Sequence, residues 1–225
     1  IFQDIYSHPI KNNLIGDRIS EIKSKGVICG VSVTPANTKR LSPLAVEAGA
    51  DILFVQSTVT TARHESKSLK GLVFSELLKT TNIPVIVGNC VSYETALELM
   101  ETGIDGILVG VGPGAACTTR EVTGVGVPQV TATLDCSSAR DEFHKRTGKY
   151  VPIITDGGIR NGGDLCKAIA SGADGVMIGR AAYHHPEMLA NISKPDQTIA
   201  PSDTLERIKK YLDYMHAQVE LGERL

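Results

Sequence analysis

The chain has 225 residues, and its 25 Asp and Glu residues nearly balance its 23 Lys and Arg residues, giving a formal net charge of -2. This balance, with a sequence pI near 6.3, argues against the basic surface that nucleic-acid-binding proteins carry. Hydrophobic residues make up 42% of the chain, and 22 glycines accompany them, which is typical of a globular protein with an aliphatic core and tight turns.

The apolar stretches are too short to cross a membrane. Those at 50–56 and 104–111 fall well below the roughly 18 residues that a span requires. The first residues, Ile1–Asp4, include no initiator Met, basic segment or apolar segment, so we expect an interior cut of a longer chain rather than a signal peptide. No transmembrane helix and no membrane partner are predicted.

The cysteines favour a reducing compartment. They are odd in number and form no CxxC pair, which disfavours both a disulfide framework and a zinc site; they are Cys29, Cys90, Cys117, Cys136 and Cys166. All except Cys117 fall on predicted helices or in or at the end of predicted strands, where we expect them to serve as packing residues. We therefore predict a cytoplasmic protein without a metal centre formed by cysteines.

Strand and helix signals alternate along the chain. In order they predict a helix at 14–25, a strand at 27–33, a helix at 38–48, a strand at 49–55, a helix at 69–80, a strand at 83–88, a helix at 93–102, a strand at 103–109, a helix at 130–146, a strand at 151–157, a helix at 163–171 and a strand at 172–178. Three of the strands open with the same Gly-x-Asp repeat, at Gly49, Gly103 and Gly172.

This alternation predicts an α/β fold with a parallel sheet. The strands are apolar throughout, as expected for strands covered on their outer face by helices. Right-handed crossovers then leave a doubly wound sheet or a (βα)8 TIM barrel. The strands end near residue 179, and the rest contains an amphipathic helix at about 203–220, so we predict a barrel-type region at 1–179 and a helical C-terminal extension at 180–225.

A glycine-rich loop after the fourth predicted strand carries the strongest chemical signal. The sequence GVGPGAACTTR at Gly110–Arg120 has three glycines leading to one cysteine. Glycines let backbone N–H groups approach an anion, and the position after a barrel strand puts Cys117 at the functional face, where a thiolate can attack an electrophilic carbon. An inert, structural Cys117 is the alternative.

Two more glycine loops follow the last two predicted strands. They are DGGIRNGGD at Asp156–Asp164 and IGRAA at Ile178–Ala182. Paired loops of this kind at consecutive strands of a barrel are typical of phosphate sites built from backbone N–H groups. Asp156 is a candidate acceptor for two sugar hydroxyls, with a turn-capping aspartate as the simpler interpretation.

The Cys loop and the first of these glycine loops match a known family. The stretch GVGPGAACTTREVTGVGVPQ at Gly110–Gln129, with DGGIRNGGD, resembles the IMP dehydrogenase and GMP reductase superfamily, most closely the IMP dehydrogenase-related proteins without the regulatory CBS module. The similarity extends over about residues 1–179. It implies a (βα)8 barrel that binds a purine nucleoside monophosphate and NAD, or NADP, and a role in purine biosynthesis.

The resemblance also implies individual roles. Cys117 is the nucleophile that attacks purine C2, Thr119 assists proton movement, and Asp156 holds the ribose hydroxyls. The implied substrate-binding residues are Gly112, Gly114, Ala115, Asp156, Gly157, Gly158, Gly179 and Arg180. The implied cofactor-binding residues are Gln56, Ser57, Thr58, Asn89 and Gly110. A monovalent cation at the Cys loop and a homo-oligomer are implied as well.

The sequence also departs from that superfamily. Ala115 stands where many relatives have a phosphate-binding Ser, and we find no counterpart of the mobile Arg-Tyr flap that activates water in IMP dehydrogenases. The segments 179–189 and 211–218 resemble tRNA-dihydrouridine synthases, in which Gly179-Arg180 would bind the FMN phosphate. The six strands correspond to strands three to eight of the barrel, so we expect a fragment, a composite or a designed chain.

Four functions follow from these observations. NAD-dependent oxidation of IMP to XMP through a Cys117 adduct is preferred. NADPH-dependent GMP reduction, an FMN-dependent protein acting on tRNA, and an inactive phosphate-binding partial barrel are the alternatives.

Overall fold

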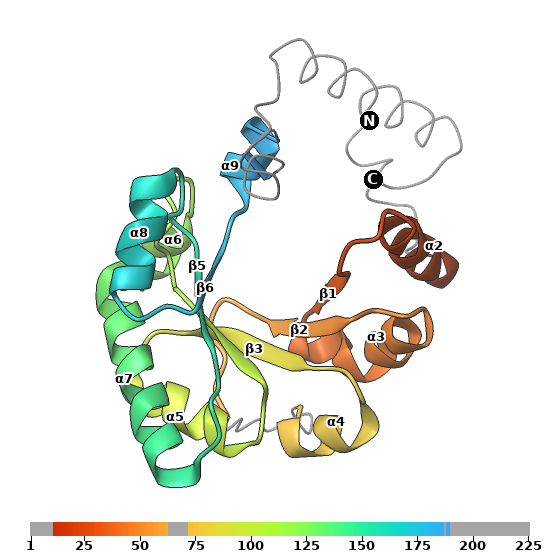
Figure 1. Ribbon diagram of the computed structural model, residues 1–225, viewed down its shortest axis with the longest axis horizontal. Coiled ribbons are helices and arrows are strands. Elements are labelled where there is room, and N and C mark those ends of the chain that lie inside the picture. Colours follow the sequence, from red (N-terminus) through yellow and green to blue (C-terminus); the bar gives the residue numbers. More distant parts are fainter. Residues whose placement is uncertain (1–10, 63–71, 187, 190–225) are drawn as a thin grey trace. The chain divides into compact units, whose positions relative to one another are not determined.

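The computed structural model describes residues 11–62, 72–186 and 188–189 (Figure 1). Residues 13–178 form one compact unit, and the described residues from Gly179 onward belong to another. The predicted division into 1–179 and 180–225 stays a prediction. Within the described residues, no helix has the length and apolar character that crossing a membrane requires.

The larger unit contains one parallel sheet whose strands are ordered β1-β2-β3-β4-β5-β6. The strands are β1 (Gly30–Val33), β2 (Ile52–Gln56), β3 (Val85–Cys90), β4 (Gly106–Val109), β5 (Ile153–Asp156) and β6 (Gly175–Met177). The helices are α2 (Asn12–Lys23), α3 (Pro35–Glu47), α4 (Phe74–Thr80), α5 (Tyr93–Glu101), α6 (Thr119–Thr123), α7 (Gln129–Thr147), α8 (Gly162–Ala170) and, in the second unit, α9 (Arg180–His184).

The six predicted strands and the predicted helices between them are confirmed. The structure also contains two short helices, α6 and α9, that the periodicity did not indicate. The predicted helix at 203–220 lies outside the described residues. The sheet curls, and helices α3, α4, α5 and α7 lie along its outer side (Figure 1). The larger unit is therefore a half-barrel, part of a (βα)8 barrel, and the predicted fold class is confirmed.

The main core lies between the sheet and its helices. Strand residues such as Leu53, Val87 and Ile107 are fully buried, in one cluster with apolar side chains of α5 and α7 that include Met100 and Cys136. Two buried hydroxyls in this layer hydrogen-bond to one another, because those of Thr133 and Thr155 are 3.0 Å apart. On β2 and β5 the residues between the buried ones, such as Phe54 and Ile154, face the other side of the sheet and are half-buried, whereas β3 and β4 are buried on both sides.

The Gly-x-Asp repeat fixes the register of the strands. The backbone N–H of Asp51 donates to the carbonyl of Cys29, whose own N–H donates to the Asp51 carboxylate at 2.8 Å. Asp105 exchanges the same pair of bonds with Val85, and Asp174 with Ile153. Each repeat thus aligns the start of its strand with the start of the preceding strand.

Four of the cysteines were predicted to be packing residues. Cys29, Cys90 and Cys136 are buried, and the sulfurs of Cys90 and Cys136 are 3.9 Å apart. Burial and the Cys90 contact raise the pKa of the Cys136 thiol, with that contact as the larger cause. The prediction was wrong for Cys166, which is exposed, because α8 buries the face that carries Ala168.

A buried arginine joins α7 to the entry of β6. Arg140 is 8% exposed and donates to the Gly172 carbonyl at 2.7 Å and to the Asp174 carboxylate at 2.8 Å. Burial raises the pKa of Asp174, but hydrogen bonds from Tyr150, the Ile153 N–H and Arg140 outweigh it and hold the pKa below its usual value. The stability that Asp174 contributes is therefore present at neutral pH and is lost as the pH falls through this lowered pKa.

We predict that Arg140→Met lowers the free energy of unfolding by about 2–3 kcal/mol, because it removes the side-chain donor to the Gly172 carbonyl and the buried cation that pairs with the Asp174 carboxylate. Arg146→Met on the same helix is the control, since the Arg146–Glu101 pair is about half exposed and is expected to contribute below about 0.5 kcal/mol. Urea unfolding at pH 7 measures both. Equal losses in the two variants would contradict the assignment.

Candidate active site

Cys117 lies where the Cys loop turns into α6. Its backbone N–H donates to the Gly114 carbonyl at 3.0 Å, which closes a turn over the exposed Ala115. The side chain is partly exposed, and its S–H donates to the Thr119 hydroxyl at 3.2 Å. The two predicted catalytic side chains are thus in direct contact, and the thiol has a hydroxyl beside it through which a proton can pass.

The side chain of Arg120 packs against the Cys loop. A Cβ added to Gly112 would lie 2.9 Å from Arg120 Cγ, and one added to Gly126 would lie 2.5 Å from it. The aliphatic part of the Arg120 side chain therefore packs against Gly112 and Gly126. A larger residue at either glycine would collide with it. The Val127 N–H also donates to the Val111 carbonyl at 3.1 Å, which ties the start of the Cys loop to the segment between α6 and α7.

Polar side chains from three strand ends meet on the inner side of the sheet. Asp156 Oδ2 accepts from Gln56 Nε2 and from Asn89 Nδ2, both at 2.8 Å. Asn89 Nδ2 also donates to the Gly110 carbonyl at 2.9 Å, and Asn89 Oδ1 accepts from Gln56 at 3.2 Å. Three of the predicted cofactor-binding residues and the predicted ribose-binding carboxylate therefore form one network.

The loop after β2 brings further hydroxyls to the same end of the sheet. The Ser57 N–H donates to the Gly88 carbonyl, and the Ser57 carbonyl accepts from the Asn89 N–H. The Ser57 hydroxyl contacts the Thr60 hydroxyl at 2.7 Å, and Thr60 donates to the Gly88 carbonyl at 2.6 Å. Thr58 is exposed, so its hydroxyl faces solvent.

The Cys loop packs directly against the glycine turn after β5. Gly110, with φ +147°, approaches Asp156 so closely that a Cβ there would lie 2.1 Å from the Asp156 carbonyl oxygen. Gly157, with φ +100°, lies against Pro113, whose Cγ would be 2.7 Å from an added Cβ. The two predicted ligand-binding loops therefore pack against one another. Only glycine, which has no side chain, fits at positions 110 and 157.

Gln129 belongs to this site, although no role was predicted for it. As the first residue of α7 it donates from Nε2 to the Val109 carbonyl at 2.6 Å, at the start of the Cys loop. Its buried Oε1 has no hydrogen-bond partner in the part of the chain that the structure describes. The only sequence signal was its place after Pro128 at the end of the loop motif.

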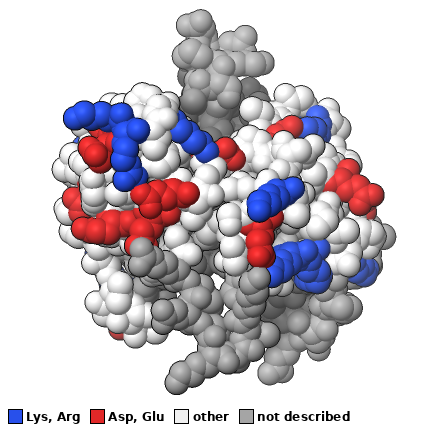
Figure 2. Space-filling model, turned by 90° about the horizontal axis from the view of Figure 1, so that it is seen from below, with Lys and Arg blue, Asp and Glu red and all other residues white. Residues whose placement is uncertain are grey.

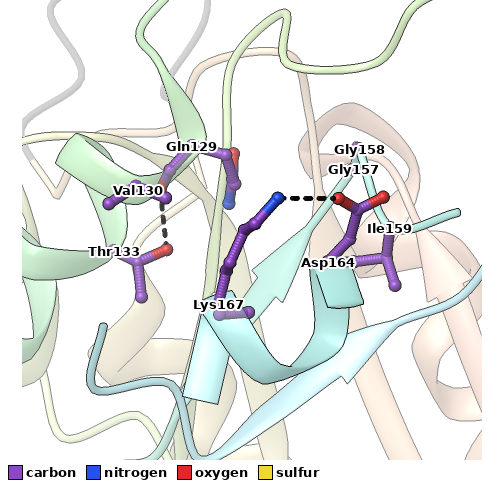
Figure 3. A pocket seen from close by; sticks show the side chains of 9 residues that line it. Gln129, Val130, Thr133, Gly157, Gly158, Ile159, Asp164 and Lys167 are labelled. Atoms are coloured by element: carbon purple, nitrogen blue, oxygen red, sulfur yellow. Dashed lines mark hydrogen bonds and ion pairs between the residues drawn. The ribbon is translucent and has the colours of Figure 1, made fainter. Parts of the chain in front are cut away.

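A cleft of about 90 Å³ opens between α7 and α8 (Figure 3). Gly157 and Gly158 line it on one side, and Asp164 and Lys167 of α8, whose charged groups are 3.7 Å apart, line it on another. Cys117 is not among the lining residues. Gly179 and Arg180, the other predicted phosphate ligands, belong to the second unit, where the Gly179 carbonyl accepts from the Ala182 N–H at the start of α9.

Charged side chains of both signs share the surface. Figure 2 shows Lys and Arg lying among Asp and Glu on the face seen there, in agreement with the near-zero net charge. Among the residues with described positions, no cluster of three or more His, Cys, Asp and Glu side chains is arranged to hold a metal ion.

The sequence profile of a family described as "IMP dehydrogenase / GMP reductase domain" matches residues 17–193, which include every side chain of the strand-end network and the Cys loop. The chain belongs to this family. The resemblance carried by the Cys-loop motif is thereby confirmed.

Relatives in this family carry several names. An uncharacterized oxidoreductase of Mycolicibacterium smegmatis is 37% identical over 193 residues, 85% of this chain and 52% of its own length. An inosine-5'-monophosphate dehydrogenase of Cryptosporidium parvum is 49% identical over 60% of this chain and 31% of its own. A GMP reductase of Leishmania donovani is 40% identical over 74% of this chain and 32% of its own.

A solved structure shares the fold. It is an IMP dehydrogenase/GMP reductase-like protein from Corynebacterium glutamicum, with 38% sequence identity and a TM-score of 0.69. The match covers 76% of this chain and 44% of that one. The chain therefore spans about half the length of the Mycolicibacterium relative and of this solved structure.

We predict that Gly110→Ala lowers the free energy of unfolding by about 2–3 kcal/mol, because the new Cβ meets the Asp156 backbone and the residue must keep a positive φ. Gly148→Ala is the matched control, since Gly148 has φ +75° and nothing within 4 Å of an added Cβ, so only about 1 kcal/mol of strain is expected. Chemical denaturation measures both. Equal destabilisation would contradict the close contact between the loops.

Proposed function

We propose that the chain is an oxidoreductase of purine nucleotides, with preferred NAD-dependent oxidation of IMP to XMP through covalent attachment to Cys117. The observation that carries the proposal is the contact between the Cys117 thiol and the Thr119 hydroxyl, on a loop that packs against the turn bearing Asp156. A nucleophile, a proton acceptor and a sugar-binding carboxylate are the groups that this chemistry needs.

The groups at the strand ends suit a nucleoside monophosphate. Asp156 is the carboxylate to which the ribose hydroxyls are assigned, and its partners Gln56 and Asn89 are neutral amides. Gly157 and Gly158 have positive φ values, a backbone form that lets consecutive N–H groups face an anion. We assign the phosphate to Gly158 and to Gly112, Gly114 and Ala115 of the Cys loop; the phosphate contacts predicted for Gly179 and Arg180 stay a prediction.

The donor set also suits a nicotinamide nucleoside. Gln56, Ser57, Thr58 and Asn89 provide neutral amides and hydroxyls at the ends of β2 and β3, matching the carboxamide and hydroxyl groups of such a cofactor in kind. When bound, NAD supplies a hydride acceptor. Thr58, whose side chain is exposed, and the Gly110 backbone are the groups that we assign to contact it directly.

The chain's own residues account for the attack and the proton movement. The Cys117 thiol passes its proton toward Thr119, and the sulfur adds to purine C2. Departure of the C2 hydride as the redox step leaves a thioimidate on Cys117, and water then attacks C2, so the C–S bond breaks, XMP leaves and the thiol is restored. The balance is IMP, NAD and water to XMP, NADH and a proton.

GMP reduction is the second candidate, favoured by the likeness to the Leishmania GMP reductase over 74% of this chain. The same sulfur would add to C2 of GMP and ammonia would leave; a hydride from NADPH would then add to C2, and the C–S bond would break to release IMP and restore the thiol. Thr118-Thr119-Arg120 suits both reactions. A flavin-dependent activity on tRNA stays a prediction, as do the cytoplasmic location and the homo-oligomer; the segment 211–218 that suggests the flavoprotein lies outside the described residues.

We predict NADH formation at 340 nm when the protein is mixed with IMP and NAD, and no flavin absorbance in the purified protein. Cys117→Ala should lower this rate by at least about a thousandfold while nucleotide binding persists, because only the nucleophile is lost. NADPH consumption with GMP instead would support the second candidate. Turnover with neither pair, or full activity in Cys117→Ala, would contradict the proposal.

A further inference from the structure

We infer that Asn89 and Gln56 are positioning residues that hold one oxygen of Asp156, so that the other oxygen is presented to the ribose hydroxyls of the nucleotide. The inference rests on the proposed function for the identity of the ligand. It assigns Asn89 and Gln56 a task different from the direct cofactor contact predicted for them.

The hydrogen-bonding capacity of the Asn89 side chain is used within the protein. Asn89 is 6% exposed. Both of its amide hydrogens are used, toward Asp156 Oδ2 at 2.8 Å and the Gly110 carbonyl at 2.9 Å, and its Oδ1 accepts from Gln56 at 3.2 Å. Because the carboxylate and the carbonyl are acceptors only, the NH2 group must face them, which fixes the orientation of the amide.

Gln56, at the end of β2, completes the support. Its Nε2 donates to Asp156 Oδ2 at 2.8 Å, and its Oε1 lies 3.4 Å from the Ser32 hydroxyl. Both amides converge on Oδ2, and neither of these bonds uses Oδ1. A carboxylate oxygen can accept more than one hydrogen bond, so Oδ1 keeps the capacity for a pair of ribose hydroxyls. Holding the carboxylate before the ligand arrives reduces the entropy lost on binding.

Neutral donors at positions 56 and 89 are essential to this arrangement. The groups that face Asp156 are Gln56 from β2, Asn89 from β3 and the Gly110 backbone after β4, none of which is charged. On the neighbouring α8, Asp164 and Lys167 pair with one another, and Asp164 also pairs with Arg160. An acidic group at position 89 would therefore stand at hydrogen-bonding distance from Asp156, and two such carboxylates cannot both ionise freely.

The test is the pH dependence of nucleotide binding in Asn89→Asp and Gln56→Glu. At pH 5.5 the shared proton lets the new acid donate to Asp156, whereas at pH 8.5 both groups ionise and repel. We expect the dissociation constant for IMP or GMP, measured by titration calorimetry, to rise by at least about tenfold between these pH values relative to the wild-type profile. Asn37→Asp, an exposed amide that bonds Thr34 at the start of α3, is the control and should follow the wild type.

Three outcomes separate this inference from the proposed function. A pH profile of either site variant parallel to that of the wild type, with binding retained, overturns the positioning role while the function stands. Failure of the wild-type protein to bind IMP or GMP overturns the function. In that case thermal unfolding without ligand tests the contact between position 89 and Asp156. Asn89→Asp must lose stability relative to the wild type as the pH rises. A difference in stability that does not depend on pH overturns the inference.

Discussion

The hydrogen bond between Gln56 and Asp156 is the contact on which the functional end of the molecule depends. Gln56 ends β2 and Asp156 ends β5, and two strands, β3 and β4, lie between them in the sheet. Side chains this short meet across two strands only where the sheet curls. The curl is thus what makes a site from residues 100 positions apart in the sequence.

The two ends of the sheet do different work. At the strand entries, the carboxylates of Asp51, Asp105 and Asp174 accept hydrogen bonds from backbone N–H groups of the preceding strand, and these bonds fix the register. At the strand exits, Asp156 is held by side-chain amides instead. Backbone pairing serves stability, whereas the two amides both bond Oδ2 of Asp156, and the proposed ligand contact of its Oδ1 agrees with the division of roles between the two faces of a barrel.

Much of the fold was predictable from the sequence because its signals are local. A Gly-x-Asp repeat followed by an apolar run marks the entries of three strands, and helical spacing marks the helices between the strands. The Cys loop was recognisable for a similar reason, since three glycines and a cysteine within eight residues have few structural explanations. The helix α6, with five residues and no buried side chain, has no apolar period and was therefore missed.

The contacts within the site were not predictable in the same way. Nothing near Gln56 or Asn89 in sequence indicates that both donate to Asp156, since that depends on the curvature of the sheet. Gln129 reaches the start of the Cys loop only because the segment before α7 folds back to Val111 and places the first residue of that helix beside Val109. Cys166 was misassigned because its exposure depends on which face of α8 packs against the sheet.

The proposed chemistry takes place at Cys117, whose thiol contacts the Thr119 hydroxyl on a loop that packs against the turn after β5. The most direct measurement is mass spectrometry of the protein quenched in acid during reaction with IMP and NAD. We predict a purine nucleotide covalently attached to the peptide that carries Cys117, and its absence from Cys117→Ala. Turnover without any adduct, or an adduct on the exposed Cys166, would contradict the account.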